Sequence, residues 1–420
     1  MALLLQSLGG AKANGDEHMT DVLKGIKVLE VAQFWFVPAA GAILADWGAD
    51  VIKVEHPVRG DAQRGLTVGL MMGQPGPDFL MQQSNRNKRS VGIDIGTPEG
   101  LELIYKMAAE CDVFLTNFLP DARQKLKIEY EDIKKHNDKI VYVRGHGQGA
   151  RGPDKEKGGY DATAFWMRGG VGGGITPEGA DAPVMQRAAF GDSIGALAVA
   201  QGVMGGLFRK ERENRGSEVD VSLLNTAMWT MAPDIVASKI LDGGIPSHPR
   251  TSSPNPITNT YKTKDGKWFI LLALQPDRYW PEVCERLERP ELEKDERFKD
   301  GMQRYMNREA CIAELSKTIG ERTLAQWTDR FSTMETPWGA MQTPTTVHDD
   351  CQVAPNGYLQ TVDTGEHGDL TLVSNPIQFD NAPSPLQRAP EMGEHTDEVL
   401  QEFGLDMDKL MDLKVKGAIL

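Results

Sequence analysis

The chain has 420 residues, which is too long for one compact core and predicts two or more domains. Its composition, with 40% apolar and 25% charged residues, is ordinary for a globular protein. A net charge of −14 makes nucleic acid and anionic membrane surfaces unfavourable partners, so a polyanionic ligand would need a local basic pocket.

The first part of the chain alternates apolar strands with helical segments. After a polar tail at 1–21, we expect strands at 26–32, 50–56, 90–95, 111–117 and 139–144, and helices at 37–48 and 97–110. The second helix opens on Thr97-Pro98-Glu99, an N-cap followed by a proline and an acid in the first turn. Strands that alternate with helices pair in parallel through right-handed crossovers, so the pattern predicts a doubly wound, Rossmann-like α/β large domain. The first strand is not followed by a GxGxxG motif, which argues against NAD or FAD.

The later part of the chain mixes longer helices with a hairpin. We expect a helix at 194–213, a strand at 217–222, a helix at 223–241, a hairpin at 261–273, and helices at 278–287 and 324–334. The hairpin turns at Lys264-Asp265-Gly266, and the segment 243–256, rich in Gly, Pro and Ser, is typical of a linker. We therefore expect residues 22–224 to form the first part of the large domain, 225–345 to form a smaller α+β domain, and 346–420 to return to the large domain.

Cysteine and histidine usage bears on the compartment. Cys111, Cys284, Cys311 and Cys351 show no CxxC spacing, which favours reduced thiols over disulfides or a zinc site. The eight histidines include no pair with metal-ligand spacing, so no metal is expected. The first residues lack the basic region of a signal peptide, and no segment approaches the roughly 18 apolar residues of a spanning helix. These features predict a cytoplasmic protein.

The most informative residue is Asp161, which follows a glycine pair and opens an apolar stretch within residues 158–170. An aspartate beside glycine is usually a turn or helix-cap residue, but a desolvated carboxylate can also be the nucleophile of an acyl-transfer enzyme. Other motifs accompany it along the chain, namely Leu29-Glu30-Val31, 48–55, 87–90, Gly191-Asp192-Ser193 and 393–400. In that order, over residues 22–412, this set resembles the class III CoA-transferases, also called the CaiB/BaiF family.

The resemblance implies a CoA-transferase with Asp161 as its catalytic residue, in an accessible cleft. The Asp161 carboxylate would attack the thioester carbonyl of an acyl-CoA and expel the CoA thiolate, which leaves an aspartyl-acyl anhydride. The thiolate would then attack the aspartyl carbonyl to give an aspartyl-CoA thioester, and the acceptor acid would enter by the reverse path. Because one thioester is exchanged for another, CoA and acyl-CoA are substrates and no permanently bound cofactor is expected. The implied partners are acyl-CoA, a small carboxylic acid and a second copy of the chain in an interlocked homodimer.

The CoA-binding positions of the family fall on His56, Ile93, Gly96, Asn117, Phe118, Lys125, Arg144 and His146. The resemblance implies phosphate contacts for Lys125 and Arg144, an adenine contact for Phe118, and a place along the CoA channel for His146. Relatives often carry arginine where this chain has His56, and lysine where it has Gly96. For Lys88 and Arg89, a phosphate contact and a solvated strand entry are equally open.

Further segments bear on the same site. The glycine-rich run 169–174 could donate backbone N–H groups to an oxyanion, or form a turn between a helix and a strand. The four-glycine loop that closes the active site of some relatives is replaced by Ser253-Pro254-Asn255-Pro256. Trp35 and Phe36 are expected to be exposed aromatic residues that suit an apolar acyl group. Thr396 is expected to cap a helix.

Two other functions are alternatives. The α-methylacyl-CoA racemases of the same superfamily carry a histidine just before the position of Asp161 and an acid at the position of Asp192. This chain has Tyr160 in place of the histidine, and a phenol with a pKa of about 10 is a poor base at neutral pH, which favours the transferase. A non-catalytic CoA-binding protein is the second alternative. The segment around Asp161 looks similar to the phenyllactate and 2-hydroxyisocaproate CoA-transferases, which favours an aryl or branched-chain acid as substrate.

Overall fold

The computed structural model describes residues 21–66, 76–241, 244–365 and 368–420, and all but the last residue of the predicted tail at 1–21 lies outside them. The described residues divide into two compact units. The first unit comprises the chain up to Lys239 together with Cys351–Leu420, and the second comprises Ile240–Asp350. The second unit is thus inserted between two parts of the first.

The first unit is built on a parallel sheet of six strands within the described residues. Its strands are β1 (Lys27–Val31), β2 (Asp50–Glu55), β3 (Arg89–Gly92), β4 (Val113–Thr116), β5 (Val141–His146) and β6 (Ser217–Ser222). They lie in the order β3-β2-β1-β4-β5-β6, the order of doubly wound dinucleotide-binding folds. The predicted parallel α/β sheet is confirmed.

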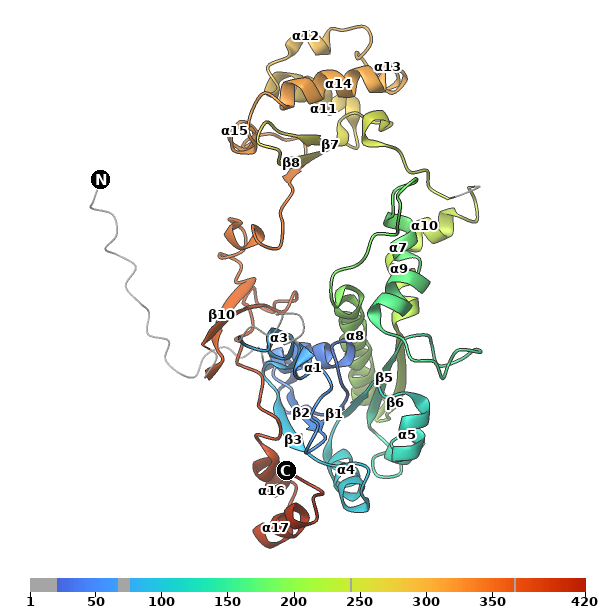
Figure 1. Cartoon of the computed structure of the whole chain (residues 1–420), viewed down its shortest axis with the longest axis vertical. Helices are drawn as coiled ribbons and strands as arrows, with labels where there is room; N and C mark the ends of the chain where they lie inside the picture. The colour runs from blue at the N-terminus through green and yellow to red at the C-terminus, as the bar shows by residue number, and fades with distance from the viewer. Residues whose placement is uncertain (1–20, 67–75, 242–243, 366–367) are drawn as a thin grey trace, which may run out of the picture. The chain divides into compact units, whose positions relative to one another are not determined.

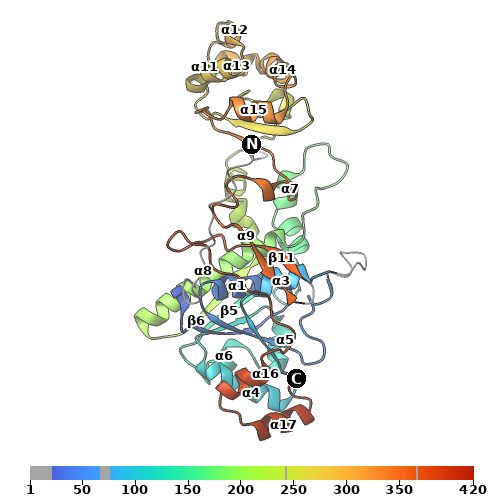
Figure 2. The ribbon, with the colours of Figure 1, turned by 90° about the vertical axis from the view of Figure 1, so that its left-hand side faces the viewer.

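The strands β1, β2 and β4 contribute apolar residues to cores on both faces of the sheet, as strands covered on both faces do. Val28 of β1 is level with Val51 of β2 and Val113 of β4, and all three belong to one core cluster with α1 (Phe36–Asp46) and α8 (Phe190–Glu213). The next residue along each strand enters the opposite cluster, which α4 (Pro98–Glu110), α16 (Thr396–Glu402) and α17 (Met407–Val415) cover. Figures 1 and 2 show α16 and α17 beside α4, below the sheet. The core on this face of the sheet is therefore built from the N-terminal and the C-terminal parts of the first unit together.

Shorter elements complete the first unit. They are η1 (Asp21–Leu23), α3 (Phe79–Asn85), α5 (Pro120–Leu126), α6 (Tyr130–Ile133), the π-helix η2 (Asp161–Arg168), α7 (Val171–Ile175), α9 (Leu223–Thr230), α10 (Ala232–Ala237), and the antiparallel pair β10 (Leu359–Asp363) and β11 (Asp369–Val373). The single helix expected at 223–241 is wrong, because α9 ends at Thr230 and α10 begins at Ala232. Pro233 lacks an N–H donor and therefore sits in the first turn of a new helix instead of inside a longer one.

The second unit packs helices against a small antiparallel sheet. The sheet contains β7 (Thr258–Lys262), β8 (Trp268–Leu272) and β9 (Trp338–Ala340). The helices are α11 (Pro276–Arg286), α12 (Pro290–Glu293), α13 (Gly301–Met306), α14 (Arg308–Ile319) and α15 (Leu324–Arg330), with η3 (Arg250–Ser252) and η4 (Val347–Asp349) at either end. Trp280, Trp327 and Phe269 belong to its core. The predicted hairpin turn is confirmed, with Gly266 at a φ of 78°.

The C-terminal segment is fixed to the edge strand β3. The Gly92 N–H donates to Thr396 Oγ1 at 3.0 Å, and the His395 N–H donates to the Ser90 carbonyl at 2.9 Å. Thr396 is the first residue of α16 and His395 is its N-cap, so the predicted capping role of Thr396 is wrong. The Thr396 hydroxyl instead joins two parts of the chain that are far apart in sequence. Within the described residues, no helix has both the length and the apolar character needed to cross a membrane.

Candidate active site

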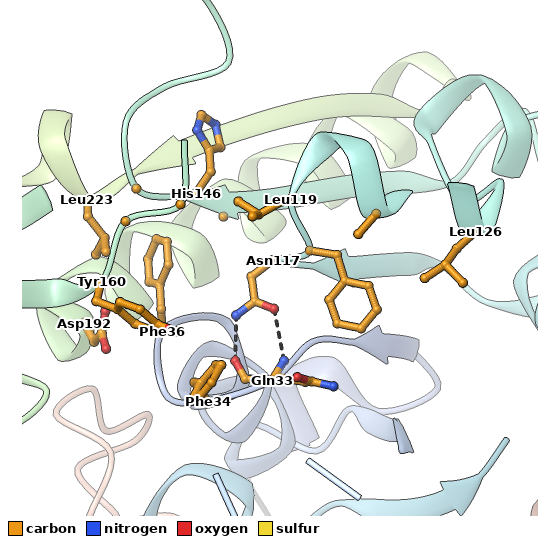
Figure 3. Close-up of a pocket in the computed structure, with 16 residues that line it drawn as sticks. Gln33, Phe34, Phe36, Asn117, Leu119, Leu126, His146, Tyr160, Asp192 and Leu223 are labelled. Carbon is orange, nitrogen blue, oxygen red and sulfur yellow. Dashed lines mark hydrogen bonds between the residues drawn. The ribbon is translucent and has the colours of Figure 1, made fainter. Parts of the chain in front are cut away.

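A cavity of about 430 Å³ lies at the carboxyl ends of β1, β4 and β5 in the first unit. Ligands of doubly wound sheets bind at this edge, where the strand order reverses between β1 and β4. Figure 3 shows its lining residues, which are Gln33, Phe34, Phe36, Asn117, Phe118, Leu119, Ala122, Leu126, Gly145, His146, Gly147, Gly158, Gly159, Tyr160, Asp192 and Leu223. We call this space the acyl pocket, after the acyl group that the resemblance in the sequence implies.

A second cavity, of about 470 Å³, shares Gln33, Phe118, Ala122 and Leu126 with the acyl pocket. Its other lining residues are Val54, Glu55, His56, Arg59, Ile93, Asp94, Ile95, Gly96 and Lys125. We call it the basic pocket, because the side chains of Arg59 and Lys125 stand exposed at its wall. The structure thus brings together most of the positions that the sequence resemblance picked for CoA. Arg59 was missed, although it lies three residues after His56, where relatives often carry arginine.

The loops around the acyl pocket need glycine because backbones meet there. A methyl group at Gly147 would lie 2.6 Å from Gly159 Cα, and one at Gly145 would lie 2.5 Å from Val37 Cγ2. The first of these close approaches holds the loop after β5 against the segment that precedes Asp161, and the second packs β5 against α1. Within the motif Gly158-Gly159-Tyr160-Asp161, packing therefore requires a glycine at Gly159.

Asp161 is the first residue of the π-helix η2 and is only 6% exposed, so the expected accessible carboxylate is wrong. The Gly191 N–H, in the first turn of α8, donates to both carboxylate oxygens at 3.1 and 3.2 Å. Burial raises the pKa of Asp161, while the backbone N–H groups of Asp192 and Gly191 and the Gln186 side chain oppose that rise. The positive end of the α8 dipole stabilises the ionised form further.

Gly191 is required for this contact. A methyl group at Gly191 would lie 2.2 Å from the Phe165 ring and 2.5 Å from Asp161 Oδ1. The aspartate can therefore approach the helix end only because residue 191 has no side chain. The Gly-Asp-Ser motif at 191–193 supplies this space and places Asp192 next to it.

Asp192 lines the acyl pocket near Tyr160, on the same side of the pocket (Figure 3). Burial, together with the charge of Asp161, raises the pKa of Asp192 to about 7. Tyr160 is 67% exposed, and its ring meets the Phe34 ring edge-on at 5.8 Å. The two carboxyl groups therefore differ: backbone N–H donors hold Asp161, whereas Asp192 keeps its proton up to about neutral pH.

A further part of the pocket wall comes from the segment after β1, residues 32–36. Asn117 holds it by accepting from the Gln33 N–H at 3.0 Å and donating to the Gln33 carbonyl at 2.6 Å, the two dashed bonds of Figure 3. Phe36 is 5% exposed at the start of α1, and Trp35 is half-buried with its Nε1 donating to Ser193 Oγ. The prediction of two exposed aromatic residues here is therefore wrong. Phe34, which the sequence did not single out, lies beside the pocket instead.

Arg144 and His146 occupy the rim of a third cavity, of about 290 Å³. The Arg144 guanidinium bonds Asp220, lies 2.8 Å from a Glu218 oxygen and is 3.8 Å from Glu129. Its charge is therefore already balanced by carboxylates. His146 Nδ1 accepts from the Gly149 N–H at 3.0 Å, which places the ring proton on Nε2, 3.5 Å from an Asp220 oxygen.

The structure corrects what the sequence suggested for Lys88, Arg89 and the glycine-rich run 169–174. Lys88 is neither solvated nor a surface phosphate ligand, because its side chain is 0% exposed and pairs with Glu30 at 2.8 Å. Arg89 pairs with Asp50 and Glu402 across β2 and α16. The glycine-rich run opens the short helix α7, so the predicted turn between a helix and a strand is wrong there.

Within the parts of the chain that the structure describes, His, Cys, Asp and Glu do not gather into a group that could hold a metal.

Comparisons with known proteins now bear on this geometry. The family model described as CoA-transferase family III matches residues 23–396. The chain belongs to CoA-transferase family III. It is 32% identical to (R)-2-hydroxy-4-methylpentanoate CoA-transferase of Clostridioides difficile, over 94% of this chain and 98% of that protein. It is 31% identical to cinnamoyl-CoA:phenyllactate CoA-transferase of Clostridium sporogenes, over 95% and 97%.

A solved structure of a CAIB/BAIF family protein from Brucella suis superposes with a TM-score of 0.77 and 28% identity, over 90% of this chain and 98% of that one. The resemblance found in the sequence is therefore confirmed, and the chain is a CoA-transferase by family. These matches do not favour the racemase or the non-catalytic alternative.

Proposed function

We propose that the protein transfers CoA from an acyl-CoA to a free carboxylic acid, with Asp161 as the nucleophile. The observation that carries the proposal is the buried Asp161 carboxylate, which the Gly191 N–H holds at the start of α8. Asp161 is not itself among the lining residues of the acyl pocket, but its chain neighbour Tyr160 and the residue after Gly191, Asp192, both line it. A carboxylate removed from water is a stronger nucleophile, and fixed donors hold the carboxylate group in one orientation.

Each step exchanges one acyl bond for another. An Asp161 oxygen forms a bond to the thioester carbon, the C–S bond breaks, and the thiolate carries away the electron pair. The thiolate then attacks the aspartyl carbonyl and releases the first carboxylate, which leaves an aspartyl-CoA thioester for the acceptor acid. Asp192, protonated up to about pH 7, would donate a hydrogen bond within the same pocket. CoA enters as a substrate, and the scheme needs no bound cofactor.

The proposed CoA path runs from the basic pocket, for the phosphates and adenine, into the acyl pocket, for the thioester. Support comes from the shared wall at Gln33, Phe118, Ala122 and Leu126, which makes the two cavities neighbours. Arg59 and Lys125 place two exposed cations at a wall that also carries Asp94, on a chain whose net charge is −14. The other carboxylate of this wall, Glu55, is paired with Arg64. Arg144, which the resemblance also implied, would reach phosphate only by leaving Asp220.

Replacing Lys125 or Arg59 by alanine should raise the KM for acyl-CoA by roughly two- to tenfold and change kcat less. Phosphate contacts are equally strong in the ground and transition states, so their loss weakens binding without slowing the chemical step. Steady-state kinetics at low and high salt would measure this, and the difference from the wild type should shrink as salt screens the charges. Lys139→Ala, a change at an exposed lysine outside both pockets, serves as the control. An unchanged KM in both pocket variants would contradict the proposed path.

The proposed substrates are 2-hydroxy acids with an apolar aryl or branched side chain. The acyl pocket is walled by Phe34, Phe36, Leu119, Leu126 and Leu223, which suit an apolar group. Relatives named for 2-hydroxy-4-methylpentanoate and for phenyllactate support this class. A chromatographic screen of acyl-CoA and acid pairs should show CoA transfer to such acids and little transfer to formate or oxalate. A preference for the small acids would contradict the substrate class.

We also propose that the chain acts as an interlocked homodimer. The second unit is an insertion in the first, which gives each chain the two connections that an interlocked pair needs. Large apolar side chains stand exposed on α8, α9 and α10 of the single chain, namely Phe208 (65%), Trp229 (83%) and Val236 (61%). Exposed apolar side chains of this kind are typical of a surface that a partner subunit covers. Light scattering should give twice the 46.2 kDa of one chain, with very slow dissociation on dilution. An active monomer at micromolar concentration would contradict the dimer.

A further inference from the structure

Four charged side chains lie fully buried beneath the segment that walls the acyl pocket. Glu30 of β1, Lys53 of β2, Asp61 and Lys88 are each 0% exposed, and we call them the buried quartet. Lys53 Nζ lies 2.7 Å from Asp61 Oδ2 and 3.2 Å from Glu30 Oε1, and Lys88 Nζ lies 2.8 Å from Glu30 Oε2. The two acids and two lysines balance in charge, although burial lowers the pKa of Lys88 to about 8 despite the opposing charge of Glu30.

The buried quartet reaches the backbone of the segment 32–38 at three points. Lys53 Nζ donates to the Ala32 carbonyl at 3.0 Å, Asp61 Oδ1 accepts from the Phe34 N–H at 2.9 Å, and Lys88 Nζ donates to the Pro38 carbonyl at 2.7 Å. These bonds span the turn from the end of β1 into α1. Hydrogen bonds from charged side chains therefore hold this turn in addition to the backbone bonds of β1 and α1.

Phe34 sits at a φ of 64°, a left-handed conformation that is unfavourable for a non-glycine residue and persists only where the surroundings enforce it. Asp61 bonds the N–H of this residue, and the ring of Phe34 lines the acyl pocket. The left-handed turn at Phe34 is what directs its side chain toward the pocket and Tyr160. A relaxed turn would move the ring and the Gln33 backbone together.

Buried ion pairs are seldom the most stabilising choice, since apolar side chains of similar volume often replace them at little cost in stability. A role in stability alone therefore does not explain a quartet of buried charges at this place. The packing around it is also exacting, because a methyl group at Gly41 would lie 1.9 Å from Glu30 Oε2. The three hydrogen bonds from the quartet to the backbone of the 32–38 segment offer a better explanation for its place in the fold.

We infer that Asp61, Lys53 and Lys88, with Glu30, are positioning residues for the transfer reaction: they hold the 32–38 turn so that Phe34 and Gln33 present a rigid wall to the thioester. This inference rests on the proposed function for its kinetic consequence, but the rigidity of the turn can be measured without any substrate. The buried quartet is separated from the reacting atoms by the turn itself, so it acts only through that backbone.

The decisive variant is Lys53→Met combined with Asp61→Leu, which replaces one ion pair by apolar groups of similar size. Thermal unfolding should show a folded protein of lower stability, because the Phe34 N–H and the Ala32 carbonyl lose these partners. The turnover number should fall roughly a hundredfold, with a smaller change in the KM for acyl-CoA, because displacing the wall disturbs the reacting geometry. Hydrogen exchange of the peptide containing Phe34 should become faster, while the small second unit keeps the wild-type exchange. Asp61→Asn retains an oxygen acceptor for the Phe34 N–H and should therefore keep more turnover than the double variant.

Gly41→Ala provides a second route to the same result. It disturbs Glu30 and Lys88 from the α1 side without changing a charge or a pocket residue, and should also lower turnover and speed exchange at 32–38. A folded double variant, or a folded Gly41→Ala variant, with wild-type turnover and wild-type exchange would overturn the inference. If the wild-type chain transfers no CoA, the proposed function fails, whereas the exchange measurement still decides whether the quartet holds the turn.

Discussion

Replacing Asp161 by asparagine should lower the rate of CoA transfer by at least about a thousandfold. Asparagine has the same shape, and its oxygen can still accept from the Gly191 N–H, but it has no carboxylate to form the anhydride. Alanine would be a less clean change, because it would leave the buried Gly191 N–H without its acceptor, at a cost of roughly 1–3 kcal/mol. Steady-state rates and thermal unfolding should be measured together, and the Asp161→Asn variant should remain folded.

The covalent intermediate gives this prediction a second measurement. Acyl-CoA followed by hydroxylamine should convert the activated aspartyl group to a hydroxamate, which mass spectrometry would locate on the peptide containing Asp161. Asp138→Asn removes an exposed carboxylate outside the pockets and should keep both the rate and the hydroxamate. Wild-type rates in Asp161→Asn, or a hydroxamate on another residue, would contradict the assignment of the nucleophile.

Replacing Gly191 by alanine should lower kcat at least about a hundredfold while Asp161 itself is unchanged. The new methyl group would lie 2.2 Å from the Phe165 ring and 2.5 Å from Asp161 Oδ1, so both must move. Overpacking of this kind costs roughly 1–3 kcal/mol, which chemical denaturation would measure as a lower free energy of unfolding. The lost rate would show that the position of the carboxylate matters as well as its presence.

The matched control lies in the same helix. Among the described residues, no atom comes within 4 Å of a methyl group added at Gly205 of α8. Gly205→Ala should therefore keep kcat and stabilise the helix by roughly 0.5–1 kcal/mol. Equal losses of kcat in Gly191→Ala and Gly205→Ala would mean that changes anywhere along α8 disturb the site, and would contradict the close-approach argument.

Features with local causes were predictable from the sequence. The N-cap at Thr97 is confirmed, with its hydroxyl accepting from the Gly100 N–H, because a cap depends on neighbours three residues away. The hairpin at Lys264-Asp265-Gly266 is likewise confirmed. Positions such as Phe118 and Lys125 line one cavity since parallel strands all end at the same edge of a sheet. Their common place at that edge is a consequence of the sheet topology.

Features with distant causes were not predictable. The sequence left Lys88 open between two surface roles, yet it is buried against Glu30, 58 residues away. Arg144 faces Asp220 because β5 and β6 pair in register, a contact that no local pattern announces. In each case the sequence shows the charge of the side chain but does not show which distant carboxylate pairs with it.

The sequence by itself determined the parallel α/β sheet, the family and the order of the motifs, because periodicity and motif spacing are properties of neighbouring residues. The tertiary structure alone decided that Asp161 is buried against α8, that Gly191 makes room for it, and that Phe34 walls the pocket. The physical reason is that burial, close approach and a left-handed turn at Phe34 depend on which distant segments pack together. Side-chain identity fixes what chemistry is possible, and long-range packing fixes where that chemistry is held.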